Sequence, residues 1–369
     1  MTTEFHRLPF QTGNTDRLAP LDGLRGLAAI AVALMHGTSI FNLRWVPLHA
    51  YLAVDFFFLL SGYVIARAFD RRLQQGWVIG FLQRRLIRLY PFIVMGSLLG
   101  FLEMIIHGVF EHAVSLSQAV LDMVSSLLVI PTPPLVSQHW RSYPVDPPLW
   151  SLFFEMAANA FYAIAAPSLR NRHLWLLVGL SGLALAGAVF LQNGGDFGLS
   201  HFKLAGLRVL FSFFLGVALY RALGPSPKFR AMPFAATALI CAVLGLVLLG
   251  PMPPGWIYDL LAIFAVFPAL LVLALIARPG GARSQAACLI LGLASYPLYA
   301  IHLPLFLLTY GTLFDGSGPG GRAFGMAASL AAVLFLSWLL AVFYDQPIRR
   351  RLSMLALRSG AASGSPTIA

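Results

Sequence analysis

Apolar runs of about twenty residues recur along the whole chain. There are ten of them, at residues 20–42, 48–68, 88–108, 149–168, 174–191, 203–221, 232–250, 255–277, 286–310 and 323–344. Each is close to the roughly 20 residues with which an α-helix crosses about 30 Å of hydrocarbon. Backbone polar groups in that layer must be satisfied within the segment, so helices are the expected form. The pattern predicts an all-α, polytopic membrane protein with about ten transmembrane helices.

Composition and charge agree with this interpretation. Of the 369 residues, 59% are hydrophobic and 11% are charged, whereas a soluble domain is about 25% charged. The net charge of +11 would favour nucleic-acid binding in a soluble protein. With the N-terminus placed in the cytoplasm, however, 20 of the 25 Lys and Arg residues fall on the cytoplasmic side; the others are Arg44, Arg141, Lys203, Arg208 and Arg322.

This bias follows the positive-inside rule. It predicts that both termini are cytoplasmic and that the chain is a multi-pass protein of the inner (cytoplasmic) membrane. The basic excess is then mostly a signal of topology, and no nucleic-acid partner is expected.

Three regions are expected along the chain. Residues 1–19 form a cytoplasmic segment, 20–350 the transmembrane domain, and 351–369 a partly disordered cytoplasmic tail that ends in SGAASGSPTIA. The longest stretch outside the membrane, about 109–148, is predicted on the outer side. Its part 115–130 is amphipathic and is expected on the membrane surface. The proline-rich part that follows is not expected to be helical; it is either a substrate loop or an ordered connector.

Arg25 and His36 are polar residues within the first apolar run, LDGLRGLAAIAVALMHG (21–37). Eleven residues at about 100° each return to roughly the same helix face, about 16 Å further along the axis. The spacing places a cation near one membrane surface and an imidazole near mid-bilayer. Ionisable groups at that depth are costly and mark functional sites, so both are candidate functional residues.

Polar residues of the second and third runs allow two interpretations each. Asp55 either caps its helix or takes part in the site. Ser61, with Gly62, either permits close helix packing or contacts substrate. The cations Arg84, Arg85 and Arg88 in QRRLIRLYP are either topology signals or a phosphate-binding set, because guanidinium groups bind phosphate in a bidentate manner.

The later runs add further candidates. Glu155 lies about one and a half turns inside PPLWSLFFEM, after Trp150 and Ser151, and needs a partner, which an arginine would supply. In SYPLYAIH, His302 follows Tyr296 and Tyr299 and is either a packing histidine or part of the site. Asp345 in FYDQPIRR is either a salt-bridged helix end or functional. No motif for a metal site, a nucleotide-hydrolysing P-loop or a serine nucleophile is present, and no metal is expected.

Six segments in this order resemble the acyltransferase-3 family of integral-membrane O-acyltransferases: LDGLRGLAAIAVALMH, DFFFLLSGYVI, RRLIRLYP, LWSLFFEMAANAFY, SYPLYAIH and YDQPIRR. The resemblance covers nearly the whole chain. It implies transfer of an acyl group, acetyl or succinyl, from cytoplasmic acyl-CoA to a hydroxyl of an exported or cell-envelope carbohydrate or glycolipid. It also assigns the family's Arg-x10-His signature to Arg25 and His36, and its paired arginines to Arg85 and Arg88. The family's usual Glu before the last proline is Asp345 here.

These inferences give a working hypothesis. Arg84, Arg85 and Arg88 bind the phosphates of acyl-CoA. His36, Arg25 and Asp345 are catalytic, with His36 acting either as a general base or through a covalent acyl-histidine. The remaining candidates, which contact the acceptor, are Asp55, Ser61, Trp150, Ser151, Glu155, Tyr296, Tyr299 and His302.

Two other functions stay open. One is a proton-coupled transporter or flippase with His36, Glu155 and His302 as a relay. The other is acylation of a lipid or macrolide-like acceptor. A homo-oligomer is compatible with either function.

Overall fold

A computed structural model describes residues 18–132, 143–191, 202–224, 234–252, 255–276, 281–349, 351, 352 and 354. All regular structure in this part of the chain is helical. Eight helical segments within it are long and apolar enough to cross a membrane. The predicted spans 149–168 and 232–250 correspond to shorter apolar helices, Leu149–Ala165 and Ala236–Leu249. The prediction of an all-α, polytopic membrane protein is therefore confirmed, with two of the ten spans shorter than expected.

The helices, in chain order, are α1 (Ala19–Ile40), η1 (Ala50–Leu52), α2 (Ala53–Gln74), α3 (Val78–Glu103), η2 (Met104–Val109), α4 (Leu116–Leu128), α5 (Leu149–Ala165), α6 (Asn171–Leu191), α7 (Phe202–Leu223), α8 (Phe234–Leu249), α9 (Trp256–Leu261), η4 (Ala262–Val266), α10 (Phe267–Ile276), α11 (Ala282–Thr309), η5 (Tyr310–Phe314), α12 (Pro319–Leu339) and η6 (Leu340–Asp345). The segment η1 is a 3₁₀ turn, whereas η2, η4, η5 and η6 are π-helical segments that continue α3, α9, α11 and α12.

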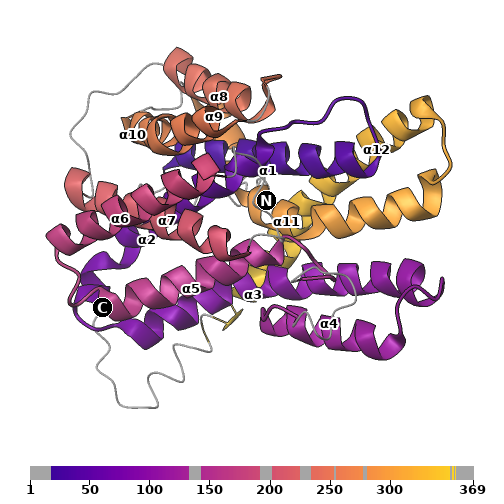
Figure 1. The fold of residues 1–369 in the computed structure, drawn as a ribbon, viewed down its shortest axis with the longest axis horizontal. Helices are drawn as coiled ribbons and strands as arrows, with labels where there is room; N and C mark the ends of the chain where they lie inside the picture. Colours follow the sequence, from indigo (N-terminus) through magenta and orange to yellow (C-terminus); the bar gives the residue numbers. More distant parts are fainter. Residues whose placement is uncertain are drawn as a thin grey trace, which may run out of the picture.

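Helices α1 and α11 form the most extensive helix pair, and they lie side by side in Figure 1. Small residues allow this contact. A Cβ added at Gly26 of α1 would lie 2.5 Å from the Cβ of Leu291 in α11, so only glycine fits there. Close approach through small residues is the usual means of helix association in a membrane. The pair brings two segments that are some 270 residues apart in sequence into one unit.

Helices α2 and α7 form a second close pair. A Cβ at Gly62 would lie 1.9 Å from the carbonyl oxygen of Phe213, so the predicted packing role of Gly62 is confirmed. Ion pairs hold the two ends of this pair. Asp55 lies 3.0 Å from Arg208 near the start of α2, and Asp70 lies 2.8 Å from Arg221 near its end.

Helix α4 coincides with the predicted amphipathic segment 115–130. Ser115 caps it by accepting a hydrogen bond from the backbone N–H of Gln118, at 3.2 Å. Leu116, Val120 and Val124 are exposed, as a membrane-surface helix requires. The helix packs along α3, as Figure 1 shows. Its location on the membrane surface stays a prediction.

The connection into α5 carries a buried carboxyl group. Asp146 is 1% exposed, and neither of its carboxyl oxygens has a hydrogen-bond partner among the described residues. Burial raises the pKa of Asp146 well above its usual range. A Cβ at Gly96 would lie 2.5 Å from the Asp146 Oδ2, so α3 packs closely over this group. Much of the proline-rich segment, at 133–142, lies outside the described residues, as do most of 1–19 and of 351–369.

Candidate active site

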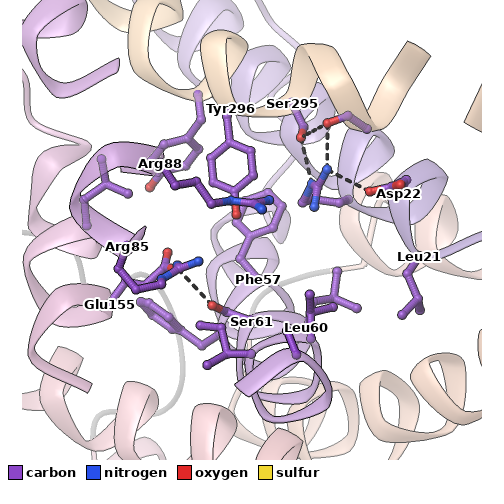
Figure 2. Close-up of a pocket in the computed structure, with 18 of the residues that line it drawn as sticks. Leu21, Asp22, Phe57, Leu60, Ser61, Arg85, Arg88, Glu155, Ser295 and Tyr296 are labelled. Atoms are coloured by element: carbon purple, nitrogen blue, oxygen red, sulfur yellow. Dashed lines mark hydrogen bonds and ion pairs between the residues drawn. The ribbon is translucent and has the colours of Figure 1, made fainter. Parts of the chain in front are cut away.

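A cavity of about 700 Å³ lies between α1, α2, α3, α5 and α11, with the end of η6 at its margin. Its wall contains five arginines: Arg25, Arg67, Arg85, Arg88 and Arg349. All five are among the residues predicted on the cytoplasmic side, and that side stays a prediction. Figure 2 shows four of the functional candidates, Arg85, Arg88, Glu155 and Tyr296, around this cavity.

Arg25 links α1 to α11 at the wall of the cavity. Its Nη2 donates to the carbonyl oxygen of Gly292 at 2.7 Å, and its Nε donates to the Ser295 hydroxyl at 2.9 Å. The carboxylate of Asp22, one turn earlier, lies 2.8 Å away. Figure 2 shows two of these partners, Asp22 and Ser295, at the wall of the cavity. Arg25 therefore has a fixed position, with most of its donors already used.

Arg85 and Glu155 form an ion pair between α3 and α5. The Ser61 hydroxyl of α2 donates to the same Glu155 oxygen at 2.9 Å. Both charged side chains are about nine-tenths buried. Glu155 thus has the arginine partner that its position in an apolar run required, and Arg85 is largely neutralised.

Arg88, one turn after Arg85, has no carboxylate within ion-pair distance among the described residues. Its guanidinium lies 4.9 Å from the ring centre of Tyr296, and that of Arg25 lies 5.0 Å from the same ring. The Nε of Arg88 is buried and lacks a hydrogen-bond partner in the described part of the chain. A partly buried guanidinium in a cavity wall, in contact with a tyrosine and not with a carboxylate, is a natural anion contact.

Asp345 is the third carboxylate of the cavity wall. It is buried at the end of η6 and forms an ion pair with Arg349, one turn later. The lining thus contains five arginines against three carboxylates, Asp22, Glu155 and Asp345. Arg67 and Arg88 are the two arginines not paired with any of these carboxylates, and the cavity keeps an excess of positive charge.

Two lining residues, Ser151 and Tyr299, are joined by a hydrogen bond. The hydroxyls of Ser151 in α5 and Tyr299 in α11 are 2.7 Å apart, and Phe57 packs against the Tyr299 ring at 5.8 Å between centres. The ring of Tyr299 also contacts His302, with 5.9 Å between the ring centres.

His36 and His302 meet directly. The Nδ1 of His36 and the Nε2 of His302 are 2.9 Å apart, with the rings nearly parallel at 24°. His302 is fully buried, whereas His36 is partly exposed. Neither lines the cavity, but His302 contacts Tyr299, which does, so the histidine pair lies next to the cavity wall.

Three predicted site residues lie elsewhere. Arg84 is exposed and stacks on Trp77 at 5.1 Å. Trp150 packs against Phe154 beside the cavity without lining it. Asp55 is paired with Arg208 in a buried cluster outside the lining. The described residues contain no group of three or more potential metal ligands.

Sequence reasoning missed Asp22, Arg67, Ser295 and Arg349 as lining residues. Asp22 and Arg349 each lie one turn from a predicted residue, Arg25 and Asp345, and the helical i, i+3 and i, i+4 rule contained that signal. Ser295 directly precedes Tyr296, but nothing in the sequence indicated its contact with Arg25.

The chain is similar to three bacterial proteins, two of which are named as acyl-transferring enzymes. It is 27% identical to the "Putative membrane-bound transacylase BcsY" of Komagataeibacter xylinus over 94% of this chain and 88% of that protein. It is 32% identical to "Protein 2 in picA locus" of Rhizobium radiobacter, over 47% of this chain and 97% of that protein. It is 28% identical to "Peptidoglycan O-acetyltransferase OatA" of Listeria monocytogenes, over 46% of this chain and 28% of that protein.

No solved structure matches the chain significantly. The family comparison matches residues 18–342 to the acyltransferase-3 family, described as "Acyltransferase domain". That range contains every residue of the cavity wall except Asp345 and Arg349, and also contains both members of the histidine pair. This result favours the enzyme over the transporter. The chain belongs to the acyltransferase-3 family and is a multi-pass membrane O-acyltransferase.

Proposed function

We propose that this enzyme transfers an acyl group, with acetyl as the first choice and succinyl as the second, from cytoplasmic acyl-CoA to a hydroxyl of a cell-envelope or exported carbohydrate. The observation that carries the proposal is one cavity whose wall contains five arginines and also Tyr299, which contacts His302 of the His36–His302 pair. The names of BcsY and OatA support the reaction class, and that of OatA supports a carbohydrate-containing acceptor.

The donor enters at the arginine-rich end. Acyl-CoA carries several negative charges on its phosphates, and the cavity has more arginines than carboxylates. Arg88 is the main phosphate contact in this proposal, because it has no carboxylate partner among the described residues and Arg85 is held by Glu155. Arg67 is the second contact. The pantetheine arm then extends towards Tyr299 and Ser151.

The acceptor reacts at His36. His36 takes the proton of the acceptor hydroxyl as general base, the oxygen attacks the thioester carbonyl, and the C–S bond breaks. The coenzyme A thiolate leaves and takes up the proton, so the products are the ester and free coenzyme A. Arg25 and Asp345 act indirectly: both are engaged in ion pairs in the cavity wall, which they keep in shape.

The test uses membranes that contain the full-length enzyme and [14C]acetyl-CoA, with [14C]succinyl-CoA in parallel. We expect label in the envelope carbohydrate with the wild type and none with His36→Ala. His173→Ala is the matched control, because His173 is exposed at the start of α6. Label that persists in His36→Ala refutes the role of His36, and absence of carbohydrate label in the wild type with both donors refutes the proposed reaction.

The donor site is tested by kinetics. Arg88→Ala removes a charge-assisted phosphate contact worth about 1.5–3 kcal/mol, so the KM for acyl-CoA is expected to rise by at least about tenfold. Arg172→Ala, at an exposed arginine of α6, is the control. An unchanged KM for Arg88→Ala contradicts the assignment of the phosphate site.

A further inference from the structure

The hydrogen bonds of His302 determine which nitrogen of His36 is free to act as a base. The Nδ1 of His302 lies 2.9 Å from the carbonyl oxygen of Leu298, one turn earlier in α11. A carbonyl oxygen only accepts hydrogen bonds, so this Nδ1 carries a proton. The one remaining nitrogen of His302, its Nε2, faces His36.

His302 is uncharged in this environment. It is fully buried, and its ring neighbours are His36, Tyr299 and Phe306. No carboxylate pairs with it among the described residues, and an unpaired buried charge is very unfavourable. A neutral imidazole has one N–H, and Leu298 already receives it. The Nε2 of His302 is therefore an acceptor.

The protonation of His302 determines that of His36. Because the Nε2 of His302 accepts, the Nδ1 of His36 must be the donor across the 2.9 Å contact. In neutral His36 the proton is then on Nδ1 and the lone pair is on Nε2. This Nε2 has no hydrogen-bond partner in the described part of the chain, and the His36 side chain is partly exposed, so the basic nitrogen is available to a substrate.

We propose that His302 is a positioning residue that fixes the tautomer of His36, with the relay running from the Leu298 carbonyl through His302 to His36. The inference rests on the proposed function of His36 as the base. When His36 takes the acceptor proton on Nε2, the hydrogen bond from its Nδ1 to His302 strengthens and stabilises the imidazolium. The proton then passes from His36 to the departing thiolate, and His302 keeps its own proton throughout.

Substitutions at His302 separate this role from packing. The Gln side chain places its amide oxygen near the position of the His Nε2, so His302→Gln keeps an acceptor for His36. His302→Asn is polar but too short, and His302→Leu fills the space without an acceptor. We expect kcat to fall on the order of a hundredfold in the Asn and Leu variants, in the range that general-base catalysis contributes. The Gln variant should stay within about tenfold of wild type, and the KM for acyl-CoA should change little in all three.

The outcomes are distinct. Equal activity of the Gln and Leu variants, or wild-type kcat in the Leu variant, overturns the proposal. If the Leu variant fails to elute as a folded species in detergent, the comparison of Gln with Asn decides in the same way. A rise in KM without loss of kcat also overturns it, because it indicates a contact with the donor.

A second measurement does not depend on activity. In the purified full-length protein labelled with ¹⁵N-histidine, the signals missing from His36→Ala identify His36. We expect its Nδ1 to be protonated and its Nε2 to be unprotonated in the wild type, and a mixture of tautomers in His302→Leu. A protonated Nε2 in the wild type refutes the relay. If instead the wild type shows the expected tautomer but transfers no acyl group, the proposed function fails and the relay stands.

Discussion

The ion pair between Arg85 and Glu155 provides a test of whether Arg85 stabilises the fold or binds the donor. Their side chains are 8% and 11% exposed, and Ser61 donates to the same carboxylate. Removal of one partner leaves a charge buried without compensation, which costs about 3–5 kcal/mol. Replacement of both partners by apolar residues of similar volume is often neutral. The perturbation is therefore a cycle of Arg85→Met, Glu155→Met and the double variant.

The magnitude follows from these numbers. At roughly 2–4 °C per kcal/mol, each single variant should lower the unfolding midpoint of the detergent-solubilised protein by on the order of 10 °C. The double variant should recover more than half of that loss. The assay is intrinsic-fluorescence thermal denaturation, with Arg172→Met as a control for loss of an exposed arginine. The KM for acyl-CoA in the double variant is measured alongside.

Two results refute the reasoning. If the single variants unfold within about 2 °C of wild type, the pair is not buried as described here. If the double variant is stable but its KM for acyl-CoA rises as much as in Arg88→Ala, Arg85 contacts the donor directly. A stable double variant with a KM near wild type assigns donor binding to Arg88 and a structural role to Arg85.

Two further predictions concern packing and pH. Gly26→Ala places a Cβ 2.5 Å from Leu291 and should lower the free energy of unfolding by about 1–3 kcal/mol and reduce kcat. The control Gly179→Ala, with open space around it, should be neutral or slightly stabilising. Equal effects of the two variants on thermal midpoint and turnover contradict the close α1–α11 contact. For Asp146, whose pKa is raised by burial, the folded state binds the proton more tightly than the unfolded state, so this group lowers stability as pH rises above the ordinary carboxyl range. The thermal unfolding midpoint of Asp146→Asn minus that of the wild type should therefore increase between pH 4 and pH 8. A difference that stays constant over this range would show that Asp146 is not held protonated.

The sequence predicted most of the fold because hydrocarbon thickness leaves few options for an apolar run. The apolar helices of α1, α2, α3, α11 and α12 begin and end near the predicted bounds or extend beyond them. Helices α5 and α8 are shorter than the predicted spans, since helix ends depend on local contacts and not on composition. The packing alternative for Gly62 and the arginine partner for Glu155 were both correct.

The sequence indicates many of the individual site residues but not the contacts between them. His36 and His302 were both singled out, but their contact joins positions 266 residues apart, and nothing local in either helix encodes it. The same holds for Ser151 and Tyr299. Asp55 is a predicted site residue, yet it pairs with Arg208 outside the cavity wall. In the sequence, Arg208 is notable only as an exception to the positive-inside rule. Pairings of this kind depend on which helices are neighbours.

The hydrogen bond between Ser151 and Tyr299 also bears on the energetics of the whole membrane. An open polar channel past it, from the arginine-rich cavity to the histidine pair, would conduct protons and dissipate the electrochemical gradient that the membrane maintains. It would also admit water, which competes with the acceptor hydroxyl for the thioester. On the proposed route the acyl arm must separate these two hydroxyls, which are 2.7 Å apart, before its thioester meets His36, so such a channel would open only while the donor is bound.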